Sequence, residues 1–177
     1  MMNIRLLQLE DLEALARHKA RHSRENGRDG DFIFMPFEEE FAANDGFYQD
    51  QRAALSKSTR EPGWQKVWII TDGVEIYGEL TLVNRPPLPA CLHRCLLMMG
   101  MERTVRGQGW GSRLMKEAIS WAKAEPGLDW ISLYVFENNL PAKALYKKFG
   151  FEVVGTTKDR FRVFNQSIDD TEMVLKL

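Results

Sequence analysis

Cysteine and histidine are scarce in this chain, which has two cysteines and three histidines among 177 residues. Cys91 and Cys95 flank His93, but structural zinc normally needs four ligands and no fourth is evident in the sequence. We therefore expect no metal site and interpret Cys95 as an apolar residue of a strand. His18 and His22 lie one helical turn apart among arginines and lysines, which indicates a solvated basic helix face.

The chain also lacks long apolar runs and an excess of charge of one sign. No run reaches the roughly 18 apolar residues of a membrane span, so none is expected. Lys and Arg number 24 against 25 Asp and Glu, and a formal charge of -1 gives no electrostatic reason to expect nucleic acid or an anionic membrane as a partner. The N-terminus lacks a charged start followed by a long apolar region, so we expect no secretion signal and a cytoplasmic location.

A chain of 177 residues with 44% hydrophobic content predicts one domain, residues 1–177, with a sizeable core. The clearest hairpin lies around Asp72-Gly73, because Asp-Gly suits a turn that matches strand twist. Apolar periodicity and turn residues predict the remaining elements. In the first part of the chain we expect a strand at 3–8, helices at 11–22 and 37–57, with an interruption near 44–46, and strands at 67–71, 74–83 and 95–101. Then follow a helix at 112–124, a strand at 130–136, a helix after 139, and a hairpin with strands at 160–164 and 171–177 joined by a polar turn at 165–170.

The most informative stretch is residues 105–115, VRGQGWGSRLM, where an apolar strand runs into a glycine-dense turn that opens a helix. Gly107, Gly109 and Gly111 lack Cβ atoms, so consecutive backbone N–H groups can turn toward one point. The start of the helix adds its partial positive charge. The loop therefore predicts a binding site for an anion of pyrophosphate size.

The spacing of these glycines excludes two common phosphate loops. The dinucleotide fingerprint needs G-x-G-x-x-G, and a Walker loop needs Lys and then Ser or Thr after its last glycine, whereas Ser112 and Arg113 follow Gly111. The remaining pattern, Arg106-x-x-Gly109-x-Gly111, resembles the pyrophosphate loop of the GNAT superfamily of acyl-CoA-dependent N-acyltransferases. A glycine turn that only caps a helix is the alternative.

A second motif follows the apolar strand at 130–136. Asn139 can cap a helix that carries Pro141 in its first turn, and Gly150 can end that helix in a left-handed conformation. The pattern N-x-x-A-x-x-L-Y-x-x-x-G-F over residues 139–151 resembles the second hallmark of the same superfamily, in the same order along the chain. Two separate motifs therefore indicate one family.

The resemblance extends over nearly the whole chain and implies a fold. The class is α/β, or α+β in some schemes, with a mixed, strongly twisted, splayed sheet of about seven strands and helices on both faces. The order of predicted elements fits this architecture. Residues 101–151 carry the most specific likeness, and residues 17–64 carry the least.

The resemblance also implies an activity and a cosubstrate: transfer of an acetyl group from acetyl-CoA to a primary amine, by direct attack in a ternary complex. Backbone groups of Met99 and Met101 would bind the pantetheine arm and polarise the thioester carbonyl. Asn139 would bond the pantetheine arm, although capping the helix needs no ligand. The pyrophosphate cradle would comprise Arg106, Gly107, Gln108, Gly109, Gly111 and Ser112.

For catalysis, the resemblance assigns Tyr146 the protonation of the departing CoA thiolate, and lets its side chain also contact the cosubstrate. Periodicity alone places the same tyrosine on a buried helix stripe. The two places where many family members carry a carboxylate base hold Cys95 and Tyr134 here. Glu79 and Glu102 are the candidate bases, and each is equally typical of a solvent-facing residue at a strand end.

The acceptor is expected across the sheet split from the cosubstrate. Its class stays open between a small-molecule amine and a protein amine, and a homodimer is possible as in many family members. A non-catalytic acyl-CoA-binding sensor and an unrelated nucleotide-binding α/β protein are the alternatives. The candidate acceptor-binding residues are Phe32, Phe34, Tyr77 and Phe161, with Phe37, Asp159 and Arg160 beside them.

Overall fold

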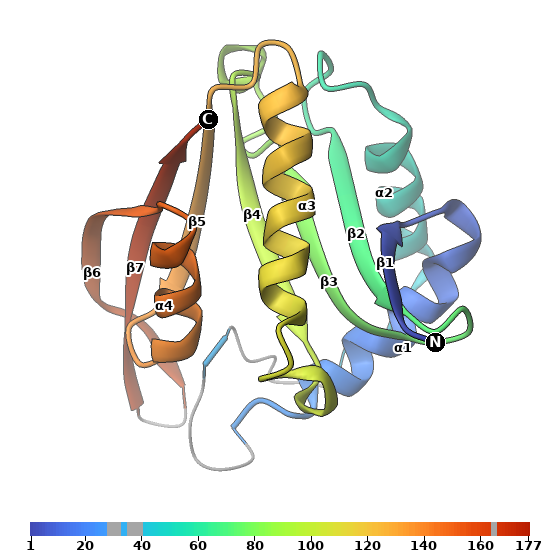
Figure 1. Cartoon of the computed structure of the whole chain (residues 1–177), viewed down its shortest axis with the longest axis horizontal. Helices are drawn as coiled ribbons and strands as arrows, with labels where there is room; N and C mark the ends of the chain where they lie inside the picture. The colour runs from blue at the N-terminus through green and yellow to red at the C-terminus, as the bar shows by residue number, and fades with distance from the viewer. Residues whose placement is uncertain (28–32, 35–40, 164–165) are drawn as a thin grey trace.

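The computed structural model describes residues 1–27, 33–34, 41–163 and 166–177. They include a seven-stranded sheet in the order β1-β2-β3-β4-β5-β7-β6, with helices on both of its faces (Figure 1). The β4–β5 pair is parallel and the other pairs are antiparallel, so the predicted mixed sheet is confirmed. No described helix is both long and apolar enough to cross a membrane.

Four strands and two helices make up the N-terminal half. Short 3-10 turns at Leu9–Asp11, Pro89–Cys91 and Arg103–Val105 join some of these elements. The bounds are β1 Asn3–Leu6, α1 Leu12–Ser23, α2 Asp45–Ser56, β2 Gln65–Thr71, β3 Ile76–Val83 and β4 Arg94–Met101.

The C-terminal half contains α3 Trp110–Ala124, β5 Trp130–Phe136, α4 Leu140–Lys148, β6 Glu152–Val163 and β7 Gln166–Lys176. The predicted polar turn over 165–170 is wrong for its described part, because residues 166–170 belong to β7. Asp170 pairs with Phe136 of β5 on one side and Thr157 of β6 on the other. The polar residues there are therefore held by strands on both sides.

The second helical stretch is shorter than expected. Residues 35–40 lie outside the described part of the chain, and α2 begins only at Asp45. The side chain of Asn44 accepts a hydrogen bond of 2.9 Å from the backbone N–H of Phe47 and so fixes this start. The predicted interruption near 44–46 is the N-cap of the helix.

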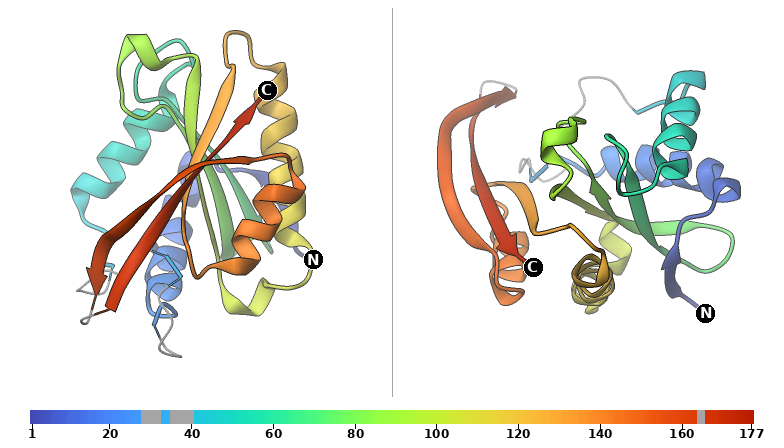
Figure 2. Two further views of the ribbon diagram at one scale, coloured as in Figure 1. Left: turned by 90° about the vertical axis from the view of Figure 1, so that its left-hand side faces the viewer. Right: turned by 90° about the horizontal axis from the view of Figure 1, so that it is seen from above.

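Two apolar clusters lie on opposite faces of the sheet, and β2 contributes to both. Trp68 and Ile70 pack in the larger core under α3, while Val67 and Ile69 pack against residues of α1 and α2. Alternate residues of one strand point to opposite faces, so β2 contributes to both cores. α3 and α4 lie on one face, and α1 and α2 on the other (Figure 2).

The sheet opens between β4 and β5. These strands pair only at Arg94–Trp130, Cys95–Ile131 and Leu96–Ser132, whereas β4 stays paired with β3 as far as Met101. β5 in turn pairs with β7 along its whole length. The two halves of the sheet therefore separate from Leu97 onward and leave an open edge on each side of the split.

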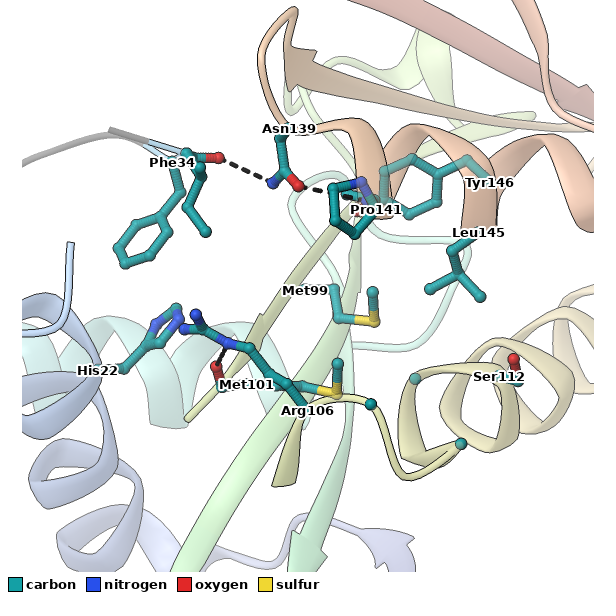
Figure 3. A pocket seen from close by; sticks show the side chains of 15 residues that line it. His22, Phe34, Met99, Met101, Arg106, Ser112, Asn139, Pro141, Leu145 and Tyr146 are labelled. Atoms are coloured by element: carbon teal, nitrogen blue, oxygen red, sulfur yellow. Dashed lines mark hydrogen bonds between the residues drawn. The ribbon is translucent and has the colours of Figure 1, made fainter. Parts of the chain in front are cut away.

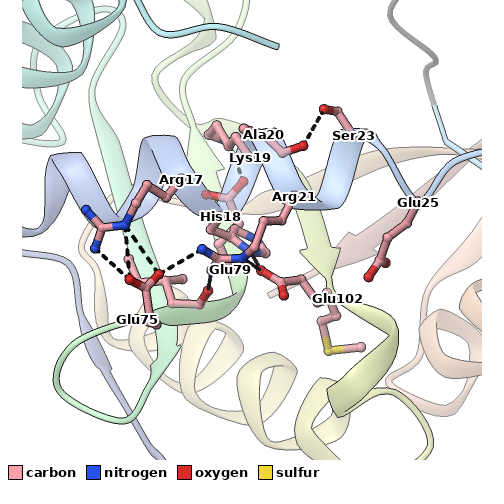
Figure 4. A network of polar contacts seen from close by, with 12 residues as sticks. Arg17, His18, Lys19, Ala20, Arg21, Ser23, Glu25, Glu75, Glu79 and Glu102 are labelled. Atoms are coloured by element: carbon pink, nitrogen blue, oxygen red, sulfur yellow. Dashed lines mark hydrogen bonds and ion pairs between the residues drawn. The ribbon is translucent and has the colours of Figure 1, made fainter. Parts of the chain in front are cut away.

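The solvated face predicted at His18 is wrong. Only 1% of His18 is exposed, and its Nδ1 lies 2.9 Å from Oε1 of Glu102. Arg21 donates to the same carboxylate at 3.0 Å and to Glu75 at 2.8 Å (Figure 4). The arginines of α1 therefore pair with carboxylates at the ends of β3 and β4, and the helix packs on this side of the sheet.

Candidate active site

A cavity of about 580 Å³ lies where the sheet opens, beside the start of α3 and the start of α4 (Figure 3). Segments far apart in the sequence meet there. The lining residues are His22, Ile33, Phe34, Met99, Met101, Arg106, Gly107, Gly109, Gly111, Ser112, Asn139, Pro141, Ala142, Leu145 and Tyr146.

The glycine loop has the conformation that its composition predicts. Gly107 and Gly109 adopt φ of 72° and 82°, in the left-handed region that side chains disfavour. A Cβ built on either glycine would meet nothing within 4 Å, so each faces open space. The loop therefore leaves room for a ligand group beside its backbone.

Gly111 serves a different purpose, which is close packing. A Cβ there would lie 3.1 Å from Cε of Met101 and 3.2 Å from Cδ2 of Leu145. The missing side chain lets the start of α3 approach β4 and α4. α3 is also uncapped by any side chain at Gly109, so its first N–H groups remain available to an anion at the cavity.

The open edge of β4 presents backbone donors to the same cavity. The backbone N–H of Glu102, the residue after β4, donates to the carbonyl of Tyr77 in β3 at 2.9 Å, so Met101 before it faces the other edge, where its carbonyl accepts a bond of 2.8 Å from Nε of Arg106. In an antiparallel pair, the N–H and C=O of one residue point to the same edge, and alternate residues repeat the direction. The N–H groups of Met99 and Met101 thus face the opening between β4 and β5.

Three other predicted cradle residues are placed differently from one another. Arg106 lines the cavity, but its guanidinium is already bonded to Met101 and ion-paired with Glu25 at 2.8 Å, and burial lowers its pKa. Ser112 also lines the cavity. The side chain of Gln108 donates to the carbonyl of Thr104 at 2.7 Å, and Gln108 is not among the lining residues.

Asn139 performs the capping role that its position predicts. Its Oδ1 accepts from the N–H of Ala142 at 3.2 Å, and Pro141 stands in the first turn of α4. Its Nδ2 donates to the carbonyl of Ile33 at 2.9 Å. Both ends of the side chain are therefore bonded within the protein, at the wall of the cavity.

Tyr146 reaches the cavity from α4. The residue is 6% exposed, and burial raises the pKa of its phenol to about 12. Its hydroxyl has no hydrogen-bond partner among the described residues. A neutral phenol with a free O–H in a largely apolar wall can donate a proton to a group that enters the cavity.

A second cavity of about 420 Å³ adjoins the first, and Tyr146, Met99 and Asn139 line both. Phe34 and Phe161, two of the predicted acceptor-binding residues, lie in its wall. The structure brings these two together with the cosubstrate candidates. Phe32 and Phe37 fall outside the described residues.

Tyr77 is not brought to either cavity. Its hydroxyl donates to Oδ2 of Asp72 at 2.8 Å, near the β2–β3 turn. Glu102 also lies outside both linings, because its carboxylate is bound by His18 and Arg21. The remaining candidate base, Glu79, does line the second cavity.

Glu79 is paired with Lys19 of α1 (Figure 4). Burial raises the pKa of this carboxyl, but the charge and hydrogen bond of Lys19, with the nearby histidines, outweigh burial and leave the pKa below its ordinary value. Glu79 is therefore ionised at neutral pH. It stands opposite Gly100 of β4, one strand from the open edge.

Among the cavity-lining residues that the sequence-based prediction missed, His22 and Asp170 have ionisable side chains. His22 lines both cavities, stacked between His18 and Phe34, and burial together with neighbouring positive groups lowers its pKa to about 3. Asp170 lines the second cavity and is 4% exposed. The i, i+4 spacing from His18 was a signal for His22, but Asp170 lies in the part of β7 that was predicted to be a turn.

Comparison with known proteins agrees with these features. The acetyltransferase (GNAT) family matches residues 31–151, more than half of the chain. The L-amino acid N-acetyltransferase AaaT of Escherichia coli is 33% identical over 97 residues, which are 55% of this chain and 59% of that protein. The mycothiol acetyltransferase of Salinispora tropica is 37% identical over 54 residues, 30% of this chain and 18% of that protein. The matches therefore span less than two thirds of either relative.

Solved structures share the fold along the full length. A GNAT-family acetyltransferase from Streptococcus pneumoniae superposes with a TM-score of 0.83 at 22% identity, covering 100% of this chain and 99% of the other. The protein yncA of Salmonella typhimurium, solved with its cofactor acetyl-CoA, gives a TM-score of 0.78 at 16% identity and covers 99% of this chain and 94% of the other. With the family match, the glycine loop and the split sheet, these likenesses show that the chain belongs to the GNAT acetyltransferase family.

Proposed function

We propose that this protein transfers the acetyl group of acetyl-CoA to a primary amine, by direct attack in a ternary complex. The observation that carries the proposal is the open edge of β4, where the N–H groups of Met99 and Met101 face a cavity that the glycine loop closes at one end. This arrangement offers donors for a thioester arm and for a phosphate group in one continuous space.

The residues present fit acetyl-CoA. Gly107 and Gly109 leave open space beside their backbones, and the uncapped start of α3 supplies N–H donors for the pyrophosphate. Arg106 stands at the same end, bonded to Met101, and adds positive charge while it fixes the end of β4. Gln108 supports the turn from outside the cavity.

Residues at the cavity can stabilise the charge that forms on the thioester oxygen and can protonate the departing thiolate. The N–H groups of Met99 and Met101 stabilise negative charge on the thioester oxygen when an amine attacks, an interaction worth about 3 to 4 kcal/mol in comparable oxyanion sites. Tyr146 donates its proton to the departing thiolate. Burial keeps this phenol neutral, so the proton is in place throughout the neutral pH range.

We propose that Glu79 accepts the proton that the amine releases, either directly or through a water molecule. The carboxylate is ionised, lines the acceptor-side cavity and stands one strand from the open edge. Its pairing with Lys19 makes it a weak base, which limits it to passing the proton on toward solvent. Asn139 is better supported as the cap of α4 than as a ligand, because both of its polar atoms are bonded.

The acceptor enters by the second cavity, where Phe34 and Phe161 form part of an aromatic wall. The relative from Escherichia coli is named an L-amino acid N-acetyltransferase, so free amino acids are the first acceptors to test. A cytoplasmic location and a homodimer remain predictions from the sequence.

Two measurements test the function. First, the thermal midpoint is recorded with excess acetyl-CoA, CoA, ATP and NAD in parallel, because a ligand at 100 times its Kd stabilises the folded state by about 2.7 kcal/mol. A rise with the two CoA species alone is expected, and a larger rise with ATP or NAD would contradict the cosubstrate. Second, thiol release is followed with a panel of amines. Binding without release across the panel would favour a non-catalytic acyl-CoA sensor.

A further inference from the structure

Strand β6 carries an irregularity beside the acceptor cavity. Between Thr157 and Phe161 it advances four positions while β7 advances only from Asp170 to Ile168, so β6 contains additional residues here. Asp159 lies within the irregularity with φ of 51°, the one positive φ outside glycine in the described chain. Bulges of this kind re-aim side chains and occur often beside active sites.

Side-chain hydrogen bonds stabilise the irregularity. The backbone N–H of Asp159 donates to Asp169 at 2.9 Å, and the Asp159 carboxylate accepts from Ser167 at 2.8 Å and from Nε of Arg162 at 3.0 Å. A non-glycine residue in the left-handed region costs free energy, and Asp is among the residues that tolerate it best. These bonds keep the local conformation fixed.

The consequence is the position of Arg160, the next residue. Its guanidinium carbon lies 5.1 Å from the centre of the Tyr134 ring and 5.7 Å from that of Phe161, at the wall of the second cavity. Its charge partner is Asp170, with Nε and Oδ2 separated by 3.4 Å, which is longer than a normal N–H···O hydrogen bond. No described residue takes a hydrogen bond from this guanidinium, and 41% of the side chain is exposed.

The other residues that line this cavity restrict the chemical class of ligand that Arg160 can bind. Arg binds carboxylate and phosphate groups through paired N–H donors. A phosphate group would face the carboxylates of Asp170 and Glu79 in the same cavity, whereas a singly charged carboxylate on a molecule that also carries an ammonium group would meet both signs of charge favourably. Phe34, Phe136 and the rings under Arg160 offer apolar contact to a side chain.

We infer that Arg160 binds the carboxylate of the acceptor, and that the acceptor is a free amino acid with an apolar side chain. This inference rests on the proposed acetyl transfer. With its carboxylate held at β6, the amino acid directs its amine toward the split in the sheet, where Tyr146 and Met99 line both cavities.

The test compares L-leucine with L-leucinamide, in which a neutral amide replaces the carboxylate, at saturating acetyl-CoA. The wild type is expected to prefer L-leucine in kcat/KM for thiol release. Arg160→Gln should lower kcat/KM for L-leucine by about 10- to 100-fold, through KM, with little change for the amide, since hydrogen bonds to charged groups have that strength. Arg160→Lys, which keeps the charge without the planar fork, should fall between them.

Lys158→Gln is the matched control, because Lys158 lies two residues away on β6, is exposed and pairs with Asp169. It removes one positive charge outside the cavity and should leave the preference for L-leucine unchanged. An Arg160→Gln variant that loses activity equally toward both acceptors would overturn the inference while the proposed function stands.

Direct binding separates this inference from failure of the proposed function. Titration calorimetry of L-leucine into the CoA-saturated protein reports carboxylate recognition without turnover. Heat of binding in the wild type that is lost in Arg160→Gln supports the role of Arg160 even if no amine releases thiol. Equal binding in both proteins would contradict it whatever the turnover.

Discussion

The side chain of Asn139 donates to the carbonyl of Ile33 across 2.9 Å, joining residues 106 positions apart in the chain. The same side chain caps α4 through the N–H of Ala142. Ile33 and Phe34 line both cavities, so one amide group fixes the start of a helix and the segment that borders the site. The two bonds can be separated by substitution.

Asn139→Asp keeps an oxygen for the cap but places a carboxylate against the Ile33 carbonyl, whereas Asn139→Ala removes both bonds. Asn139→Ala should lose about 1 kcal/mol in free energy of unfolding, the usual cost of removing an N-cap. Asn139→Asp should keep most of that stability and raise KM for the acceptor, because it repels the segment at Ile33. Denaturant unfolding and steady-state kinetics measure the two effects. Equal stability of the two variants would show that the cap contributes little.

Tyr146→Phe removes the proposed proton donor and leaves the packing of α4 in place. We expect kcat to fall by about 100-fold or more, in the range of general acid catalysis, with acetyl-CoA affinity unchanged. Tyr48→Phe is the control, since the Tyr48 hydroxyl bonds Glu13 on the surface and is not part of either cavity lining. Assays of thiol release measure kcat, and calorimetry measures the affinity for acetyl-CoA. Normal turnover in Tyr146→Phe would remove its role.

The pKa of Tyr146 predicts the alkaline behaviour of the enzyme. In the proposed mechanism the protonated phenol is the active form, and burial raises its pKa from the ordinary tyrosine value of 10.0 to about 12. The phenol therefore keeps its proton through the pH range in which an exposed tyrosine would lose it. A profile of kcat should show no descending limb up to about pH 10.5. A limb centred near pH 9 that disappears in Tyr146→Phe would contradict the structure.

Burial of Tyr146 also links its titration to stability. Because the folded state holds the proton more tightly than the unfolded chain, the contribution is complete below the unfolded pKa near 10. It is lost as the pH rises toward about 12. Urea unfolding at several alkaline pH values should show a smaller decline in Tyr146→Phe than in the wild type.

Gly109→Ala tests the phosphate-binding loop. The left-handed φ of 82° should cost an alanine about 1 to 2 kcal/mol of stability, and the new Cβ projects into the space left for the ligand. Gly127→Ala is the matched control, because Gly127 has φ of 85° and open space around it but lies beyond the far end of α3. Both variants should lose similar stability, and only Gly109→Ala should bind acetyl-CoA more weakly by calorimetry.

Glu79→Gln tests the proposed proton acceptor. We expect kcat to fall by about 10- to 100-fold with acetyl-CoA affinity preserved, because the change removes a negative charge only from the acceptor side. Glu75→Gln serves for comparison, since Glu75 pairs with the arginines of α1 and lines neither cavity. If both variants lose activity equally, the loss comes from the docking of α1 and the role of Glu79 as proton acceptor fails.

The features that local sequence determines were predicted well. The glycine loop and the Asn139 cap depend on residues within a few positions of one another, and both have the expected conformation. The partner of His18 lies 84 positions away, so its burial was not predictable from the charges around it. Arg160 was a candidate by position alone, and its orientation depends on the register between β6 and β7, which pairing across the sheet decides.

Residues near the end of β4 divide between the two cavities. Met101 lines only the cavity beside the glycine loop, whereas Met98 and Gly100 line only the acceptor cavity. The two adjoining cavities share six lining residues beside the split in the sheet, which are His22, Ile33, Phe34, Met99, Asn139 and Tyr146. In the proposed function, CoA and the acetylated amine leave from different cavities, so CoA should compete with acetyl-CoA and not with the amine.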